Sequence, residues 1–282
     1  MKFGLFGINT GHCNNPETIA RVARAAEDAG FESVWTAEHI VLPDPQVAPS
    51  PVPPDTVLFD PAIALSFIAA HTTHIRLATG IIILPQRNPV ELAKELASLD
   101  VLSQGRLIFG CAVGYLEPEY AALGASFKDR GALADEYIDV LRALWTQSSP
   151  RFSGPTVQFE GIDAHPRPVQ KPHPPIVVGG HSPAAFRRVA ARGNGWFGSA
   201  TPDALPAVLE QIERAKAEVD RAADLGEIEI TIMGMTEIDF DTARRYADLG
   251  VDRLTFLTSG SSEDEIIRSI EVQGETIVRN LA

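Results

Sequence analysis

The sequence predicts an α/β fold in which eight strand–helix units close into a (β/α)8 barrel, the TIM-barrel architecture. Eight short apolar runs alternate with segments of helical periodicity. Most of the runs are continuously apolar, which is typical of parallel strands that are buried on both faces. A length of 282 residues suits one barrel of this kind, so we expect a single domain over residues 1–282. A doubly wound sheet is the competing fold, and the number of strands favours the barrel.

The eight expected strands cover residues 3–7, 33–38, 75–84, 107–113, 175–180, 195–198, 228–233 and 253–257. Two connections are too long to be plain turns, and we expect both to be loop insertions. The first follows the second strand, spans 40–59, contains six prolines and is expected to form a lid or a mobile loop. The second precedes the fifth strand, and its segment "FSGPTVQFEGI" predicts a short hairpin.

Helix starts are marked by a repeated pair, in which a capping residue precedes a proline. The capping side chain can accept a backbone N–H bond, and proline at the first helical position removes an N–H that has no partner there. The pairs are Asn15-Pro16, Asp60-Pro61, Asn88-Pro89, Ser182-Pro183 and Thr201-Pro202. We therefore expect five helices to begin at these points.

Composition excludes several classes of function. The formal net charge is −13, which would repel a phosphate backbone, so we expect no nucleic-acid partner. No apolar run approaches the length of a membrane span. The two cysteines, Cys13 and Cys111, lack metal or redox spacing and fit a cytoplasmic location. "HTTH" at 71–74 offers two imidazoles without a third ligand, so we expect no metal site.

The carboxyl ends of the expected strands are where a barrel of this kind places its chemistry. These ends are rich in glycine and contain no paired carboxylates, as expected of a surface that receives a flat ligand. In "RLIFGCAVGY" (106–115), Gly110 and Gly114 interrupt an apolar strand, which indicates close approach of either a neighbouring backbone or a ligand. Other residues at these ends are Thr79, Gly80, Ile81 and Tyr115.

Two strand ends carry polar motifs. Glu38-His39 is an acid–imidazole pair, and imidazole can exchange a proton near neutral pH; a histidine that only hydrogen-bonds the following loop is the alternative. "GGHSP" (179–183) opens a helix directly after a strand. Its N–H groups and the helix dipole favour an anion such as a phosphate, although a plain turn has the same composition.

Three segments give the chain a family resemblance: "LATGIIILPQRNPVELAKELASLDVLSQGRLIFGCAVGY", "FKDRGALADEYIDVLRALW" and "PVQKPHPPIVVGGHSPAAFRRVAARGNGW". Their order and spacing resemble the luciferase-like oxidoreductases, most closely the branch that uses the deazaflavin coenzyme F420. The resemblance covers about residues 1–200. It implies the same barrel fold and suggests a homodimer.

The resemblance also implies roles for individual residues. Glu38 and His39 would face the deazaflavin ring, and Gly80-Ile81 would form a non-prolyl cis peptide behind it, next to Thr79. Gly114 would lie beside the ring, and Gly110 would let the strand end approach it. The phosphate of the coenzyme would meet the segment made of Val178, Gly179, Gly180, His181 and Ser182.

One position departs from the family pattern. Where a sugar-phosphate dehydrogenase of this family has a glutamate after the glycine, this chain has Tyr115, with Glu117 two residues later. The substrate of that enzyme is therefore not implied. We predict hydride transfer between coenzyme F420 and an unidentified small organic substrate, with His39 exchanging the proton and Tyr115 assisting. The alternatives are an FMN-dependent monooxygenase and a non-catalytic cofactor-binding protein on the same barrel.

Overall fold

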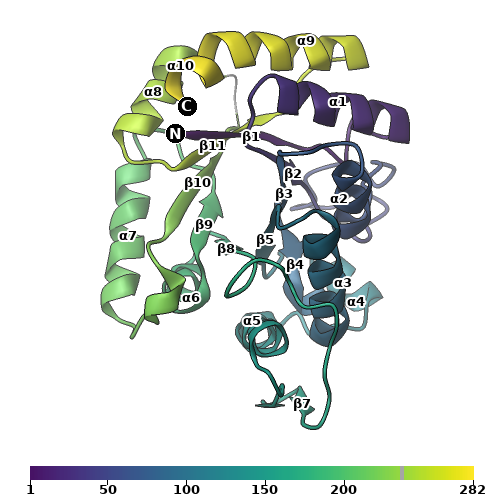
Figure 1. The fold of residues 1–282 in the computed structure, drawn as a ribbon, viewed down its shortest axis with the longest axis vertical. Coiled ribbons are helices and arrows are strands. Elements are labelled where there is room, and N and C mark those ends of the chain that lie inside the picture. Colours follow the sequence, from purple (N-terminus) through teal and green to yellow (C-terminus); the bar gives the residue numbers. More distant parts are fainter. Residues whose placement is uncertain (236–237) are drawn as a thin grey trace.

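The computed structural model describes residues 1–235 and 238–282 and contains a closed barrel of parallel strands surrounded by helices (Figure 1). The barrel strands are β1 (Lys2–Phe6), β2 (Ser33–Thr36), β3 (Arg76–Thr79) continued by β4 (Ile82–Ile83), β5 (Leu107–Ala112), β8 (Ile176–Gly179), β9 (Gly195–Gly198), β10 (Glu229–Met233) and β11 (Arg253–Leu257). Each pairs in parallel with its neighbours, and pairing of β1 with β11 and of β3 with β5 closes the ring. The predicted barrel and its eight strands are confirmed.

The helices lie outside the ring, as Figure 1 shows, with α1 and α9 along one edge and α5 at the opposite end. They are α1 (Pro16–Asp28), α2 (Pro61–Ala69), α3 (Pro89–Leu102), α4 (Glu117–Ala122), α5 (Arg130–Thr146), α6 (Pro183–Arg192), α7 (Leu205–Ala217), α8 (Phe240–Asp248), α9 (Glu263–Gln273) and α10 (Arg279–Leu281). The predicted hairpin is also present, as β6 (Phe152–Ser153) and β7 (Gln158–Phe159).

Four of the five predicted helix starts are confirmed by their capping bonds. The side chains of Asn15, Asp60, Asn88 and Ser182 each accept a backbone N–H from the first turn that follows. The fifth was wrong, because α7 begins at Leu205 rather than at Pro202. The Thr201 hydroxyl accepts the N–H of Ala204, three residues later, as the side chain of a helix cap would. Here this bond closes a turn that precedes the helix.

The third barrel strand is split by a bulge. Ala78 pairs with Ile108 and Ile82 pairs with Cys111, so three residues of this strand face two residues of β5. A bulge of this kind bends the strand and locally interrupts its ladder. The bulge contains the Gly80-Ile81 peptide bond, which is cis as predicted.

The inside of the barrel is packed in layers. Toward the ends where the strands begin, the fully buried Arg253 bonds to Glu32 at 2.9 Å and to Glu229. Above it, Trp35 and Phe197 stack with ring centroids 5.0 Å apart and planes within 7°. Because these layers fill the interior, we expect a ligand to bind at the carboxyl ends of the strands, as in other barrels of this kind.

Candidate active site at the carboxyl ends of the barrel strands

The floor of the barrel mouth is apolar. Phe6, Ile81 and Met233 pack on the Trp35–Phe197 stack and remain partly exposed. They come from the carboxyl ends of β1, the split third strand and β10, respectively. Such a surface suits a flat ring that needs to be shielded from water.

His39 and Tyr115, the two predicted catalytic residues, meet at this mouth. His39 Nε2 lies 3.3 Å from the Tyr115 hydroxyl, and the two rings stand edge to face with centroids 5.7 Å apart. The His39 side chain is only 9% exposed, whereas Tyr115 is 48% exposed. Partial burial and the nearby Glu119 raise the pKa of Tyr115, so its phenol keeps its proton at neutral pH.

Glu119, in the first turns of α4, completes this cluster and was not predicted. Its Oε2 lies 3.2 Å from His39 Nδ1, and its Oε1 accepts the N–H of Ile40 at 2.6 Å. Burial alone would raise the pKa of Glu119, but the interactions with His39 and Gln86 and the N–H of Ile40 outweigh it and lower that pKa. Pro118 is a signal from which a helix start at this point could have been predicted, but it does not show that Glu119 faces His39.

Glu38 lies in a buried ion pair. Its carboxylate pairs with Arg87 and accepts the N–H of Ile83, and Arg87 also bonds Asp60 at 2.7 Å. Burial raises the pKa of Glu38. Burial would lower the pKa of Arg87, but the Glu38 and Asp60 carboxylates raise it overall, so this guanidinium stays charged. Glu38 therefore connects the end of β2 to the segment after the bulge. No sequence pattern indicates Arg87 as its partner.

Thr79 and Gly110 hold the bulge together. The Thr79 hydroxyl donates to Gly110 O at 2.7 Å and accepts the Gly110 N–H at 2.8 Å, and Thr79 is fully buried. A Cβ on Gly110 would lie 2.0 Å from Thr79 O. Gly110 is thus required by a neighbouring backbone, which is one of the two neighbours that the sequence left open. Its approach to a ring stays a prediction. The Thr79 hydroxyl is likewise engaged within the sheet.

Gly80 and Gly114 are glycines for separate reasons. A Cβ on Gly80 would lie 3.0 Å from Thr36 O and from the Trp35 ring. Gly114 has φ +66°, which favours glycine, and a Cβ there would lie 2.6 Å from the Ile83 side chain. Both glycines therefore follow from protein packing, whether or not a ligand binds beside them.

The β8 end holds the predicted phosphate segment. Val178 is buried, and the N–H of Gly180 donates to Phe197 O at 3.4 Å. The Ser182 hydroxyl caps α6, and His181 Nε2 accepts the N–H of Ser199 at 3.2 Å. Burial lowers the pKa of His181, which favours the neutral ring. Within the described part of the chain, the N–H groups of His181 and Ser182 have no hydrogen-bond partner, and both residues are exposed to solvent.

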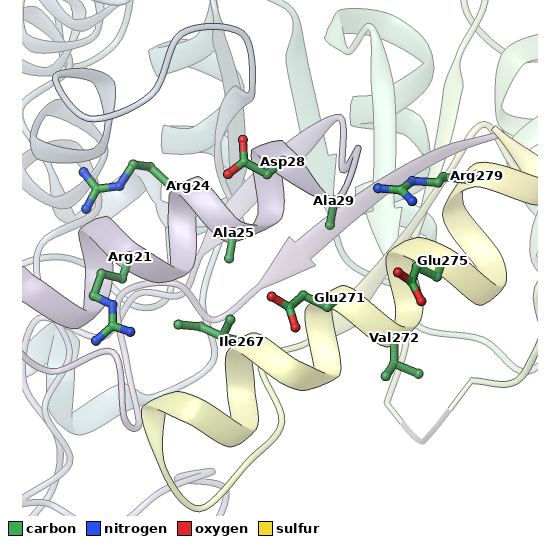
Figure 2. A pocket seen from close by; sticks show the side chains of 10 residues that line it. All are labelled: Arg21, Arg24, Ala25, Asp28, Ala29, Ile267, Glu271, Val272, Glu275 and Arg279. Carbon is green, nitrogen blue, oxygen red and sulfur yellow. The ribbon is translucent and has the colours of Figure 1, made fainter.

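A groove of about 760 Å³ on the outer surface lies elsewhere. Figure 2 shows it between α1 and α9, lined by side chains of both charges: Arg21, Arg24, Asp28, Glu271, Glu275 and Arg279. Its residues belong to the outer helices rather than to strand ends. It is therefore separate from the mouth, where the predicted site residues gather.

The protein is thus a parallel (β/α)8 barrel in which a histidine and a tyrosine meet at the carboxyl ends of the strands, where partly exposed apolar side chains also gather. The chain belongs to the luciferase-like monooxygenase family, whose pattern matches residues 1–276. It is accordingly an enzyme of the luciferase-like oxidoreductases. Among the described residues, no helix combines the length and apolarity needed to cross a membrane.

Two relatives illustrate the range of the family. The uncharacterized protein Rv0953c of Mycobacterium tuberculosis is 30% identical over 263 residues, covering 90% of this chain and 92% of that protein. The oxygenase component of the flavin-dependent trigonelline monooxygenase of Acinetobacter baylyi is 29% identical over 192 residues. That match covers 65% of this chain and half of the relative.

Solved structures share the fold at lower identity. Monooxygenase RslO1 from Streptomyces bottropensis superposes with a TM-score of 0.80 at 22% identity, covering all of both chains. The coenzyme F420 dependent tetrahydromethanopterin reductase from Methanopyrus kandleri gives 0.78 at 16% identity, covering 100% of this chain and 99% of that one. At these identities the likeness extends to the fold alone.

Proposed function

We propose that the protein transfers a hydride between coenzyme F420 and a small organic substrate. The observation that carries this proposal is the contact between His39 and Tyr115, placed at the mouth beside the apolar floor. A hydride transfer that interconverts an alcohol and a carbonyl also moves a proton, and an imidazole–phenol pair is suited to hold that proton. The predicted resemblance to the F420 branch supplies the choice of cofactor.

The residues at the mouth fit such a cofactor. The floor of Phe6, Ile81 and Met233 offers a flat apolar surface, and the N–H groups of His181 and Ser182 at the start of α6 offer a place for a phosphate. When bound, the deazaflavin supplies the carbon that carries the hydride. The chain itself supplies orientation, a proton site and exclusion of water.

His39 would accept or return the substrate proton at Nε2, the ring nitrogen that faces Tyr115. Tyr115, which keeps its phenolic proton, would donate a hydrogen bond to the substrate oxygen or to His39. The insertion over 40–59 starts directly after His39, and Thr10 binds its far end at Val57 O. This attachment would hold the insertion beside the mouth as a cover.

Titration of the purified chain with coenzyme F420 and with FMN, read by fluorescence, tests the proposal. We expect saturable binding of F420 that is much tighter than that of FMN. A screen of small alcohols and carbonyl compounds then tests turnover by the change in absorbance of the deazaflavin. Binding of FMN alone would contradict the proposal.

An FMN-dependent monooxygenase is the second candidate. The family description and the trigonelline monooxygenase relative favour it. It predicts tight FMN binding and oxygen-dependent turnover with reduced FMN. A cofactor-binding protein without activity would bind either cofactor and give no turnover in both screens. We also propose a homodimer, which sedimentation of the purified chain would test.

A further inference from the structure

We propose that Glu119 is a positioning residue that fixes the tautomer of His39, with the proton on Nδ1 and the lone pair on Nε2. The proposal rests on the proposed function for its catalytic consequence, but the tautomer itself is independent of any cofactor. It goes beyond the paired role of His39 and Tyr115 because neither residue sets which ring nitrogen carries the proton. That choice decides whether His39 can accept a proton at the mouth.

The two carboxylate oxygens of Glu119 are used differently. Oε1 accepts the N–H of Ile40 at 2.6 Å and that of Val41 at 3.4 Å, while Oε2 lies 3.2 Å from Nδ1 of the imidazole. The Gln86 side chain also interacts with this carboxylate. An ionised carboxylate has no proton to donate. The contact between Oε2 and Nδ1 is therefore a hydrogen bond only when Nδ1 carries the proton.

The ionised form of Glu119 is favoured at neutral pH. Its side chain is fully buried, and the interactions with His39, Gln86 and the N–H of Ile40 lower its pKa despite that burial. A buried carboxylate without these donors would be costly, so the same bonds that hold the loop after β2 also keep the charge next to His39. The neighbouring acid, Glu38, is paired with Arg87 and makes no bond to the imidazole.

The tautomer of His39 also decides the direction of its hydrogen bond with Tyr115. A neutral imidazole with its proton on Nδ1 presents a lone pair at Nε2, 3.3 Å from the Tyr115 hydroxyl. Tyr115 then donates to His39 rather than accepting from it. In the alcohol-oxidising direction, a substrate hydroxyl that takes the place of this phenol would give its proton to Nε2, leaving an imidazolium that Glu119 stabilises. In the opposite direction the same imidazolium would return the proton to the substrate oxygen.

The test is Glu119→Gln, which keeps the shape of the side chain. If the amide oxygen keeps the N–H of Ile40, the amide nitrogen faces Nδ1 and donates to it, which moves the imidazole proton to Nε2. Glu117→Gln is the matched control, because Glu117 lies on the same helix, is exposed and loses the same charge. ¹⁵N NMR of the full chain labelled at histidine, at a pH where the ring is neutral, reports which ring nitrogen is protonated.

We expect a protonated Nδ1 in the wild type and in Glu117→Gln, and a protonated Nε2 in Glu119→Gln. The signal of His39 is assigned by its absence in His39→Asn. A wild-type spectrum with the proton on Nε2 overturns the proposal, even if Glu119→Gln fails to fold. An unchanged tautomer in a folded Glu119→Gln also overturns it.

Measurements of turnover distinguish a failure of this inference from a failure of the proposed function. With a working substrate, Glu119→Gln should lower kcat by roughly 10²- to 10⁴-fold and change KM little, because the wrong tautomer blocks proton transfer without removing binding groups. Glu117→Gln should retain full turnover. If the wild type neither binds nor turns over F420, the proposed function fails, while the NMR result still decides the role of Glu119.

Discussion

At the scale of single residues, Gly110 shows how closely two barrel strands approach each other at the bulge. Gly110 was expected to be a site of close approach, and it is, because its neighbour is Thr79 O. A glycine signals only that a Cβ has no room, so sequence alone could not identify the neighbour. His39 and Tyr115, the two residues predicted to share the chemistry, lie in contact. Their predicted roles stay predictions. Glu119 and Arg87 were missed because they come from parts of the chain far from residues 38 and 39.

Gly110→Ala should strongly destabilise the fold. Its Cβ would lie 2.0 Å from a backbone oxygen, which a rotamer change cannot relieve. We expect a loss of about 3 kcal/mol or more in the free energy of unfolding, measured with urea. Gly131→Ala in α5 is the control, because its Cβ would meet only Arg188 at 3.7 Å. Since alanine favours helix over glycine, this control should be neutral or stabilising by up to about 1 kcal/mol.

His39→Ala and His39→Asn should differ in stability although both remove Nε2. Alanine leaves the buried Glu119 carboxylate without its imidazole donor, whereas the asparagine amide can reach the position of Nδ1 and donate to it. We expect His39→Ala to be less stable than His39→Asn by about 1–3 kcal/mol in urea unfolding. Both variants should lose turnover by roughly 10²- to 10⁴-fold. Full turnover in His39→Asn would remove Nε2 from the mechanism.

At the scale of elements, helix starts were predictable where capping is local. Asn15, Asp60, Asn88 and Ser182 cap helices through bonds that span two or three residues, which a sequence pattern can encode. The contacts between elements are not encoded in this way. Glu27 near the end of α1 is an example, since its carboxylate accepts the N–H groups of residues 73–75 just before β3.

Glu27→Gln should destabilise the junction between α1 and β3 in a pH-dependent way. Partial burial would raise the pKa of Glu27, but the three N–H groups outweigh it and lower that pKa. The stabilisation is therefore complete above the ordinary glutamate pKa of about 4.3 and is lost as pH falls through the lower folded value. We expect a loss of about 1 kcal/mol at pH 7, since the site is partly exposed, and a smaller loss at pH 3.

The control for this prediction is Asp28→Asn, which removes one negative charge from an exposed neighbour on the same helix. Urea unfolding of Asp28→Asn should stay within about 0.5 kcal/mol of the wild type at pH 7. An equal loss in Glu27→Gln at both pH values would contradict the linkage. It would mean that the shape of the side chain, rather than its charge, holds the junction.

At the scale of the whole molecule, the closed ring of strands was predicted from the count of apolar runs and their lack of alternation. The bulge that splits the third strand was expected only through the family resemblance. From the sequence alone, the mostly apolar stretch from Ile75 to Leu84 is typical of one continuous strand. Ring closure brings the first and last strands together, and β1 pairs with β11 over five residues on each strand. The N-terminal amine of Met1 lies 3.0 Å from Leu281 O, and Figure 1 shows the two ends side by side.

Because residues 1 and 282 lie close together, they can be joined and the chain can be opened elsewhere without changing the pairing of the barrel strands. Joining residues 282 and 1 with a short glycine-rich linker and opening the chain at Gly161 should preserve the fold. Gly161 is exposed and a Cβ there would meet nothing within 4 Å, so few contacts are cut. We expect the permuted chain to keep the circular dichroism spectrum of the parent and to lose at most about 2 kcal/mol of stability, because loop-closure costs change slowly with length.

Opening the same circular chain between Gly80 and Ile81 is the matched control. This cut falls in the bulge that Thr79 and Gly110 hold by two hydrogen bonds, and it separates β3 from β4 in the closed ring. The second permutant should therefore unfold at much lower urea or fail to fold, and it should lose cofactor binding. If both permutants were equally stable, the bulge would not be a structural part of the barrel, and its role at the mouth would have to rest on the cofactor alone.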